Sequence, residues 1–147
     1  MKRSIGEPIV LTHLKMVEHF AKRIGDEQLK QIDLTQSQAD VIILLAHESD
    51  KVFRQRDIEI ALNYSNPTVT GLLNRLEQKD FIARRVDPGD SRARIISLTN
   101  KALEIIEDIY QSIRRTEQML LDGFSEEEIE ILQPLMSRIA KNALRHM

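Results

Sequence analysis

Four arginines gather around a Pro-Gly pair in the segment RRVDPGDSRAR, which begins at residue 84. Guanidinium groups bind phosphate oxygens through paired N–H donors, and exposed cations at a turn can neutralise a nucleic-acid backbone. We expect Asp90 to hold Arg92 through a short ion pair and so to orient the tip of the turn. The candidate phosphate-binding residues are Arg84, Arg85, Asp90, Ser91, Arg92 and Arg94.

The distribution of charge along the chain supports this interpretation. The net charge is −2, which by itself gives little attraction for nucleic acid. Residues 51–100, however, contain nine Lys and Arg against six Asp and Glu, whereas the segments on both sides are acidic. The candidate phosphate-binding residues therefore lie in a basic middle part of the chain.

A helix-turn-helix motif is predicted directly before these arginines. Ile58 and Leu62 from a first short helix can pack against Val69 and Leu73 from a second, which gives the pair a shared apolar core. Asn63 occupies the turn position that requires a positive φ, which asparagine tolerates. The second helix then turns small polar side chains outward, as a helix that enters the major groove of DNA requires. The candidate reading residues, with Ser65 as the helix cap, are Ser65, Asn66, Pro67, Thr68, Thr70, Gly71, Asn74 and Arg75.

The elements around this motif follow from the spacing of the apolar residues. Steps of three and four predict a first helix from Pro8 to near Gly25, a second from Thr35 and a long helix from Thr99. Two short extended runs around DPGDS predict a hairpin, and a capping box at Ser125 begins a last helix. The last two helices carry more apolar surface than one small domain can cover, which predicts a dimer. The expected fold is mainly α with a small β-hairpin wing: a winged helix-turn-helix of six helices.

This pattern resembles the MarR family of winged helix-turn-helix transcription factors. DPGDSRARIISLT is similar to the family's wing signature, in which Asp90 and Arg92 form a D-x-R element and Leu98-Thr99 opens a long helix. SNPTVTGLLNRLEQKDFIARR resembles the recognition helix of the family and the lead into its wing. LTQSQADVIILL resembles the helix that precedes the motif.

The resemblance implies two regions with different roles within one continuous fold. Residues 1–34 and 99–147 would form a helical dimerisation region, and residues 35–98 the DNA-binding region. The implied partners are a second copy of the chain and a double-stranded, palindromic DNA operator. Repression is the commoner outcome in the family, and a small molecule often releases the DNA.

Three positions depart from the family pattern. Arg54 stands where the family usually has a Ser or Thr helix cap, and Glu59 stands where it usually has a small residue. Gly71 replaces a frequent arginine of the recognition helix, and glycine has no side chain to read guanine. We therefore predict an operator rich in A·T pairs, with Asn74 reaching adenine.

Other function classes find less support. An enzyme would need a nucleophile with a base, a metal or a Gly-rich phosphate loop, but the chain lacks cysteine and its histidines are scattered. No metal site is predicted, because His13 and His19 lie on different faces of one helix. No cofactor is expected either. The main alternative is a helical dimer that does not bind DNA and acts as a protein-interaction module. Steep salt dependence of binding would separate DNA binding from that alternative.

A ligand pocket between the dimerisation helices and the reading motif is a further expectation. Its effector would be a small aromatic or amphipathic molecule, since the lack of cysteine excludes a thiol sensor. No apolar run reaches the roughly 20 residues of a membrane span, and the N-terminus has no signal-peptide core, so we expect a cytoplasmic protein without membrane contact. The residues that would line such a pocket are His13, Val17, Phe20, His47 and Tyr110. Apolar helix faces look the same whether they hold a ligand or a core, and we expect most of these side chains to pack in the core.

Overall fold

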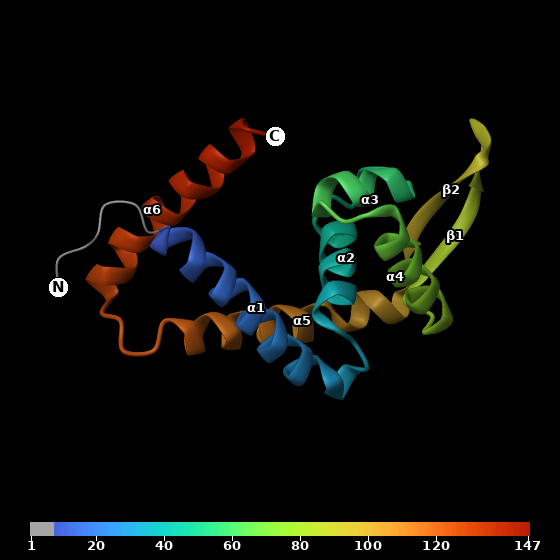
Figure 1. Cartoon of the computed structure of the whole chain (residues 1–147). Coiled ribbons are helices and arrows are strands. Elements are labelled where there is room, and N and C mark those ends of the chain that lie inside the picture. Colours follow the sequence, from blue (N-terminus) through green and yellow to red (C-terminus); the bar gives the residue numbers. More distant parts are fainter. Residues whose placement is uncertain (1–7) are drawn as a thin grey trace.

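The structure is a computed structural model that describes residues 8–147. Figure 1 shows a winged helix-turn-helix unit at one end of the long helix α5, with α1 crossing α5 and α6 standing at the other end. The predicted six helices and the hairpin are confirmed. The elements are α1 (Ile9–Leu29), a short 3-10 helix (Lys30–Ile32), α2 (Gln36–His47), α3 (Gln55–Leu62), α4 (Asn66–Gln78), β1 (Ile82–Asp87), β2 (Asp90–Leu98), α5 (Asn100–Leu120) and α6 (Glu126–Arg145).

The hydrophobic core lies where α2, α3, α4 and the hairpin meet the first turns of α5. Ile58 from α3 and Leu73 from α4 are fully buried, as the shared core of the helix-turn-helix requires. Phe53 extends the hairpin by a single β-bridge to Ile96, with its carbonyl accepting from the Ile96 N–H at 2.9 Å. This third segment joins the base of the hairpin to the start of α3. The largest fully buried side chains are Phe53, Leu29, Ile42, Ile58, Leu73, Leu76, Ile109, Gln38, Val41 and Val69.

The first helix is longer than the sequence predicted. We expected it to end near Gly25, but α1 continues to Leu29. Gly25 is buried against α2, and a Cβ atom there would meet the Oε1 atom of Gln36 at 2.1 Å. The glycine therefore serves the close approach of two helices and does not end one. The reversal comes later, at Asp33, which has a φ of 56°.

The start of α5 is fastened to the end of α4. Thr99 caps α5, accepting from the Ala102 N–H, and its hydroxyl donates to the Asp80 carbonyl at 2.6 Å. Lys101 donates to the Lys79 carbonyl at 2.6 Å and lies 4.5 Å from the centre of the Phe81 ring. The helix-turn-helix unit and α5 therefore form one continuous body.

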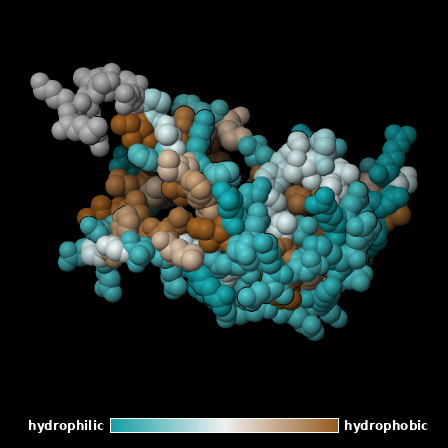
Figure 2. Space-filling view, turned by 60° about the horizontal axis from the view of Figure 1, so that its bottom comes forward, coloured by the Kyte–Doolittle hydropathy of each residue, from teal (hydrophilic) through white to brown (hydrophobic). Residues whose placement is uncertain are grey.

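The other end of the molecule leaves apolar side chains uncovered. None of the residues of α6 is buried. In Figure 2, brown apolar side chains gather on the half of the molecule where α1, α6 and the far end of α5 lie in Figure 1, around a hollow. The exposed large apolar residues at this end are Ile9, Val10, Leu11, Met16, Val17, Phe20, Ile113, Met119, Leu120, Phe124, Ile131, Leu135, Met136, Ile139, Leu144 and Met147.

Within residues 8–147, none of the helices combines the length and the hydropathy that crossing a membrane requires.

Candidate nucleic-acid interface

The turn between α3 and α4 has the conformation that the sequence predicted. Asn63 lies in the left-handed region with a φ of 53°, and its backbone N–H closes α3 on the carbonyl of Ile60. Ser65 then caps α4, since its hydroxyl accepts from the Thr68 N–H at 3.3 Å. Both predictions are confirmed. The tight turn sets α4 at a fixed angle to α3, with one face inside the fold and one outside.

The outer face of α4 is small and polar. Val69, Leu73 and Leu76 are buried, whereas the side chain of Thr70 is half-buried at the boundary. A Cβ atom at Gly71 would meet open space, so nothing in the chain covers the middle of this face. The candidate reading residues that are exposed are Ser65, Asn66, Pro67, Thr68, Gly71, Asn74 and Arg75.

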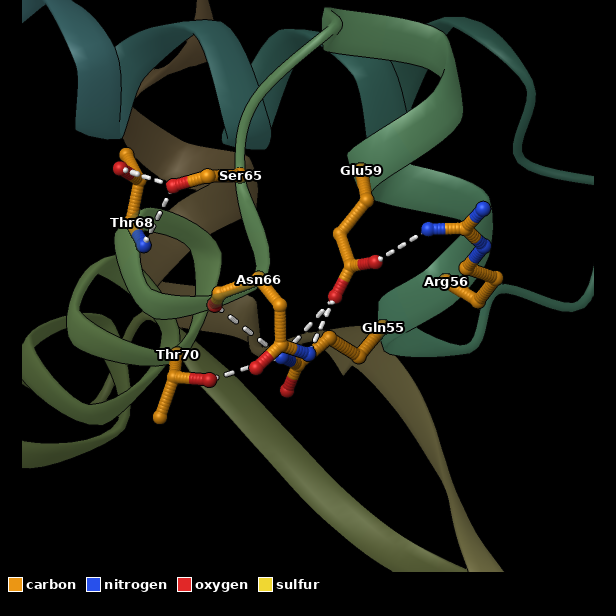
Figure 3. Close-up of polar contacts among 7 residues, drawn as sticks. All are labelled: Gln55, Arg56, Glu59, Ser65, Asn66, Thr68 and Thr70. Atoms are coloured by element: carbon orange, nitrogen blue, oxygen red, sulfur yellow. Dashed lines mark hydrogen bonds and ion pairs between the residues drawn. The ribbon is translucent and has the colours of Figure 1, made fainter.

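A buried carboxylate from α3 holds the N-terminal end of this face (Figure 3). Glu59 is only 5% exposed, and its Oε1 accepts from Asn66 Nδ2 at 2.6 Å and from Gln55 Nε2 at 3.3 Å. Its Oε2 accepts from Arg56 Nη1 at 3.0 Å. Gln55 also donates to the Thr70 hydroxyl at 2.8 Å. Glu59 thus fills the place of a small residue by becoming the centre of a satisfied polar network.

The charge of Glu59 is stabilised by this network. The hydrogen bonds from Arg56 and Asn66 hold the pKa of the Glu59 carboxyl below its usual value, although burial acts in the opposite direction. The carboxyl group is therefore ionised at neutral pH and can only accept hydrogen bonds.

Acid is expected to destabilise the helix-turn-helix by protonating Glu59. Because the folded-state pKa is lowered, the contribution to the free energy of unfolding is fully present above the ordinary carboxyl value of about 4.3. It is lost as pH falls through the lowered folded value. Glu59→Gln should flatten this pH dependence, measured by urea unfolding at several pH values. Glu130→Gln on the exposed surface of α6 is the matched control, and an equally steep acid loss in Glu59→Gln would contradict the assignment.

The hairpin forms the predicted wing. β1 pairs antiparallel with β2 from Ile82 opposite Leu98 to Asp87 opposite Asp90, around the Pro-Gly turn. Asp87 is buried, and accepts from the Gly89 N–H at 2.9 Å and from Arg54 Nε at 2.6 Å. These hydrogen bonds hold the pKa of the Asp87 carboxyl below its usual value.

Arg54 and Asp87 form a link that sequence reasoning missed. Arg54 stands at the start of α3, and its guanidinium makes an ion pair with Asp87 at the far end of β1. The two residues are 33 positions apart, so no local spacing connects them. The signal that could have found the link was the unusual arginine at the cap position.

The arginines of the wing divide into two groups. Arg84 points back to the end of α4, where it donates to Glu77 at 2.9 and 3.0 Å and to Asn74 Oδ1 at 2.8 Å. Its side chain is 23% exposed. Arg85, Arg92 and Arg94 are exposed on the strands. Of the four arginines, these three are therefore available to phosphate groups, while Arg84 has a partner within the protein.

The predicted ion pair between Asp90 and Arg92 is wrong. Asp90 Oδ1 accepts from the backbone N–H of Arg92 at 2.9 Å, and the guanidinium makes no ion pair among the described residues. A carboxylate two residues before an amide can close this short turn on the backbone, which orders the wing tip and leaves the cation free. Ser91, the remaining candidate of the tip, is exposed and its carbonyl accepts from Arg94 at 3.3 Å.

The predicted pocket residues are not brought together. His13, Val17 and Phe20 are exposed on α1, His47 is exposed at the end of α2, and Tyr110 is half-buried on α5. A cavity of about 410 Å³ does lie between α1, α2 and α5, but none of these five residues lines it. Apolar spacing identified the helices and could not identify the residues at their crossing. The lining residues are Glu18, Ala21, Lys22, Gln36, Asp40, Tyr64, Ile113, Thr116, Glu117 and Leu120.

Comparisons with known proteins agree with this geometry. A model of the MarR family matches residues 32–93. The protein in a crystal structure of the S. aureus MepR–DNA complex is 30% identical, over 91% of this chain and 97% of that one, with a TM-score of 0.80. MepR, in a structure that describes it as a transcription regulator of the Staphylococcus aureus multidrug efflux pump MepA, is 31% identical over 88% of this chain and 95% of that one, with a TM-score of 0.69.

A crystal structure of MarR shares the fold across nearly the whole length. The match covers 99% of this chain and 97% of the MarR chain, with a TM-score of 0.86 and 24% sequence identity. Two findings give the same assignment: the sequence is similar to that of MepR, and the family model matches the helix-turn-helix and most of the hairpin. The chain belongs to the MarR family of winged helix-turn-helix transcriptional regulators.

Proposed function

We propose that this protein is a cytoplasmic repressor that binds a palindromic DNA operator as a homodimer. The observation that carries the proposal is the exposed polar face of α4 beside a wing with free arginines. Arg84 bonds to Asn74, so the base of the wing adjoins the reading face. A helix in the major groove and cations on the flanking phosphates would then act from one side of the molecule. MepR, a 30% identical protein, was crystallised in complex with DNA, which supports DNA binding by this chain.

The uncovered apolar faces of α1, α5 and α6 support the dimer. Monomeric proteins seldom expose so continuous an apolar surface, and a second copy with the same faces is its simplest cover. A twofold axis through these helices would present two α4 helices to one side of DNA. The half-sites are then expected about 34–36 Å, one helical turn, apart.

Selection of bound sequences from a random duplex pool tests the proposal. We expect an inverted repeat with half-sites about one turn apart, bound with an affinity that falls steeply between about 50 and 200 mM salt. Asn74→Ala should alter the preference at one base pair of each half-site. If nothing is enriched even at low salt, the chain does not read DNA, and the helical dimer would act as a protein-interaction module.

We further propose that the cavity between α1, α2 and α5 takes an effector that releases the DNA. Three carboxylates, Glu18, Asp40 and Glu117, and one cation, Lys22, line it, together with apolar groups. This lining favours a small amphipathic cation. Tyr64 connects the cavity to the reading helix: its hydroxyl donates to Asp40 Oδ2 at 3.2 Å, and the next residue caps α4.

An aromatic quaternary ammonium compound is expected to bind this cavity and to lower the affinity for the operator. Asp40→Asn should weaken its binding about tenfold, because one carboxylate that attracts the cation is lost. Isothermal titration with the compound and fluorescence anisotropy with a labelled operator measure the two effects. Asp50→Asn, which changes an exposed carboxylate outside the cavity, is the control. Equal affinity of the compound for wild type and Asp40→Asn would contradict the site.

A further inference from the structure

Two asparagines of the reading face are oriented by residues that do not belong to that face. A side-chain amide has a donor end and an acceptor end, and either end can be turned to a base. At Asn66, Nδ2 donates to Glu59 Oε1 at 2.6 Å (Figure 3). The ionised Glu59 can only accept, so the nitrogen must face it. The Oδ1 atom of Asn66 is therefore the end turned away from α3.

Asn74, two turns further along α4, is held in the opposite sense. Its Oδ1 accepts from Arg84 Nη2 at 2.8 Å. A guanidinium group has donors and no acceptor, so the oxygen must face Arg84. Glu77 keeps Arg84 in this place through two hydrogen bonds, at 2.9 and 3.0 Å. The Nδ2 donor of Asn74 is therefore the end that is turned away from the wing.

The orientation of an amide decides which base edge it can bind. In the major groove, adenine and cytosine present an amino group that donates, guanine and thymine present a carbonyl oxygen that accepts, and both purines also present the N7 acceptor. A freely rotating asparagine can serve both kinds of edge. When a partner that only accepts or only donates holds one end of the amide, the asparagine binds one kind of base edge better than the other. Both Asn66 and Asn74 are exposed, so both are in reach of such an edge.

We propose that Glu59 and Arg84 determine operator specificity without touching DNA, by fixing the polarity of Asn66 and Asn74. Glu59 makes Asn66 present an acceptor, which selects a base with an amino group. Arg84 makes Asn74 present a donor, which selects a carbonyl oxygen or a purine N7 and so disfavours cytosine. The sequence predicted that Asn74 reaches adenine; a paired contact with adenine would need both ends of the amide, and Arg84 already binds one of them. This inference rests on the proposed DNA binding.

The structure gives each positioning residue a reason to be rigid. Glu59 is 5% exposed and both of its oxygens are engaged, so it cannot turn away from Asn66 without losing its hydrogen bonds with Arg56 and Gln55 as well. The ion pair of Arg84 with Glu77 restrains the guanidinium in the same way, since its side chain is 23% exposed. Because these partners already hold the two amides in the free protein, DNA binding loses little further conformational entropy in ordering them. This favours discrimination between bases.

The test repeats the selection from a random duplex pool with paired variants. Asn66→Ala and Asn74→Ala first identify the base pair that each asparagine reads. At the Asn66 base pair, we expect the wild type to prefer amino-bearing over carbonyl-bearing bases about tenfold. In Glu59→Gln the new amide can donate as well as accept, so this preference should fall to about twofold or less, with the other base pairs unchanged.

A double variant tests polarity against simple loss of a contact. In Glu59→Gln combined with Asn66→Asp, the glutamine can only donate to the carboxylate, which again presents an acceptor. The preference for an amino-bearing base should return, although the added negative charge lowers affinity for all sequences. Because a carboxylate at residue 66 presents an acceptor whatever stands at residue 59, this return would show that the base pair is read through an acceptor at residue 66. If the preference does not return, the inference is overturned at this position.

The other end of the helix provides an independent pair of variants. Arg84→Lys keeps a group that only donates and should keep the preference at the Asn74 base pair. Arg84→Gln can donate or accept and should lose it. If Glu59→Gln does not fold, as judged by its circular dichroism melting curve, the two Arg84 variants decide the inference.

The outcomes separate this inference from the proposed function. No enriched sequence with the wild type would overturn DNA reading and the inference with it. An enriched operator whose base preferences are the same in wild type, Glu59→Gln and Arg84→Gln would overturn the inference alone. The same holds if neither asparagine, when changed to alanine, alters a base pair.

Discussion

Replacing Leu135 and Ile139 by glutamate is expected to convert the dimer into monomers and to abolish tight operator binding. The two side chains lie four residues apart on one face of α6 and are 46% and 36% exposed in the single chain. In the proposed dimer they would be covered, and each unpaired charge buried there would cost several kcal/mol. Operator affinity should then fall by about a hundredfold or more, because two linked half-site contacts become separate events.

Sedimentation and gel-shift titration of the same samples measure this effect. Ser137→Glu is the control for adding a glutamate to α6, since it places one negative charge two residues from either position, on the other side of the helix. It should remain a dimer with nearly unchanged affinity. A double glutamate variant that stays dimeric would show that α6 lies outside the interface.

Removing two exposed cations at the end of the wing, Arg92 and Arg94, is expected to weaken binding to every DNA sequence alike. Arg92→Ala with Arg94→Ala takes four charges from a dimer, and phosphate contacts release counterions in proportion to their number. The slope of log affinity against log salt should therefore become shallower by roughly three to four, and affinity near 0.1 M salt should fall roughly a hundredfold or more. The preferred operator sequence should not change, because phosphate contacts carry no base information.

Fluorescence anisotropy across a salt series measures the slope. Lys30→Ala with Arg114→Ala removes the same number of charges at exposed positions away from the wing and serves as the control. The two variants should differ clearly in slope. If they have the same slope, the wing does not contact the DNA backbone.

The parts of the site that could be predicted from the sequence are those that local chemistry decides. Asn63 takes a positive φ because of the tight turn, and Ser65 caps α4 because it stands three residues before a helical N–H. The Pro-Gly pair closes the hairpin within a few residues of its own position. Each of these features depends on neighbours in the chain, so one sequence is enough to find it.

The features that escaped prediction depend on partners distant in the chain. Gly25 stays inside a helix because Gln36 packs on it, and Arg84 turns back toward α4 because it hydrogen-bonds to Glu77 and Asn74. The residues that line the cavity were missed for the same reason, since α1, α2 and α5 meet there. Helical spacing gives the face of each helix but not the neighbour that the face will meet.

Helix α5 has no break along its length, so a rotation at one of its ends displaces the other end. It begins on the reading unit, where Thr99 and Lys101 fasten it, and ends beside the cavity, at Glu117 and Leu120. Over its 21 residues it is about 32 Å long, so a rotation of about 10° at the dimer end moves the reading end by about 5–6 Å. A displacement of this size is enough to break a hydrogen bond between a side chain and a base. A small change of angle between protomers would therefore suffice to release DNA, with every helix and every core contact intact.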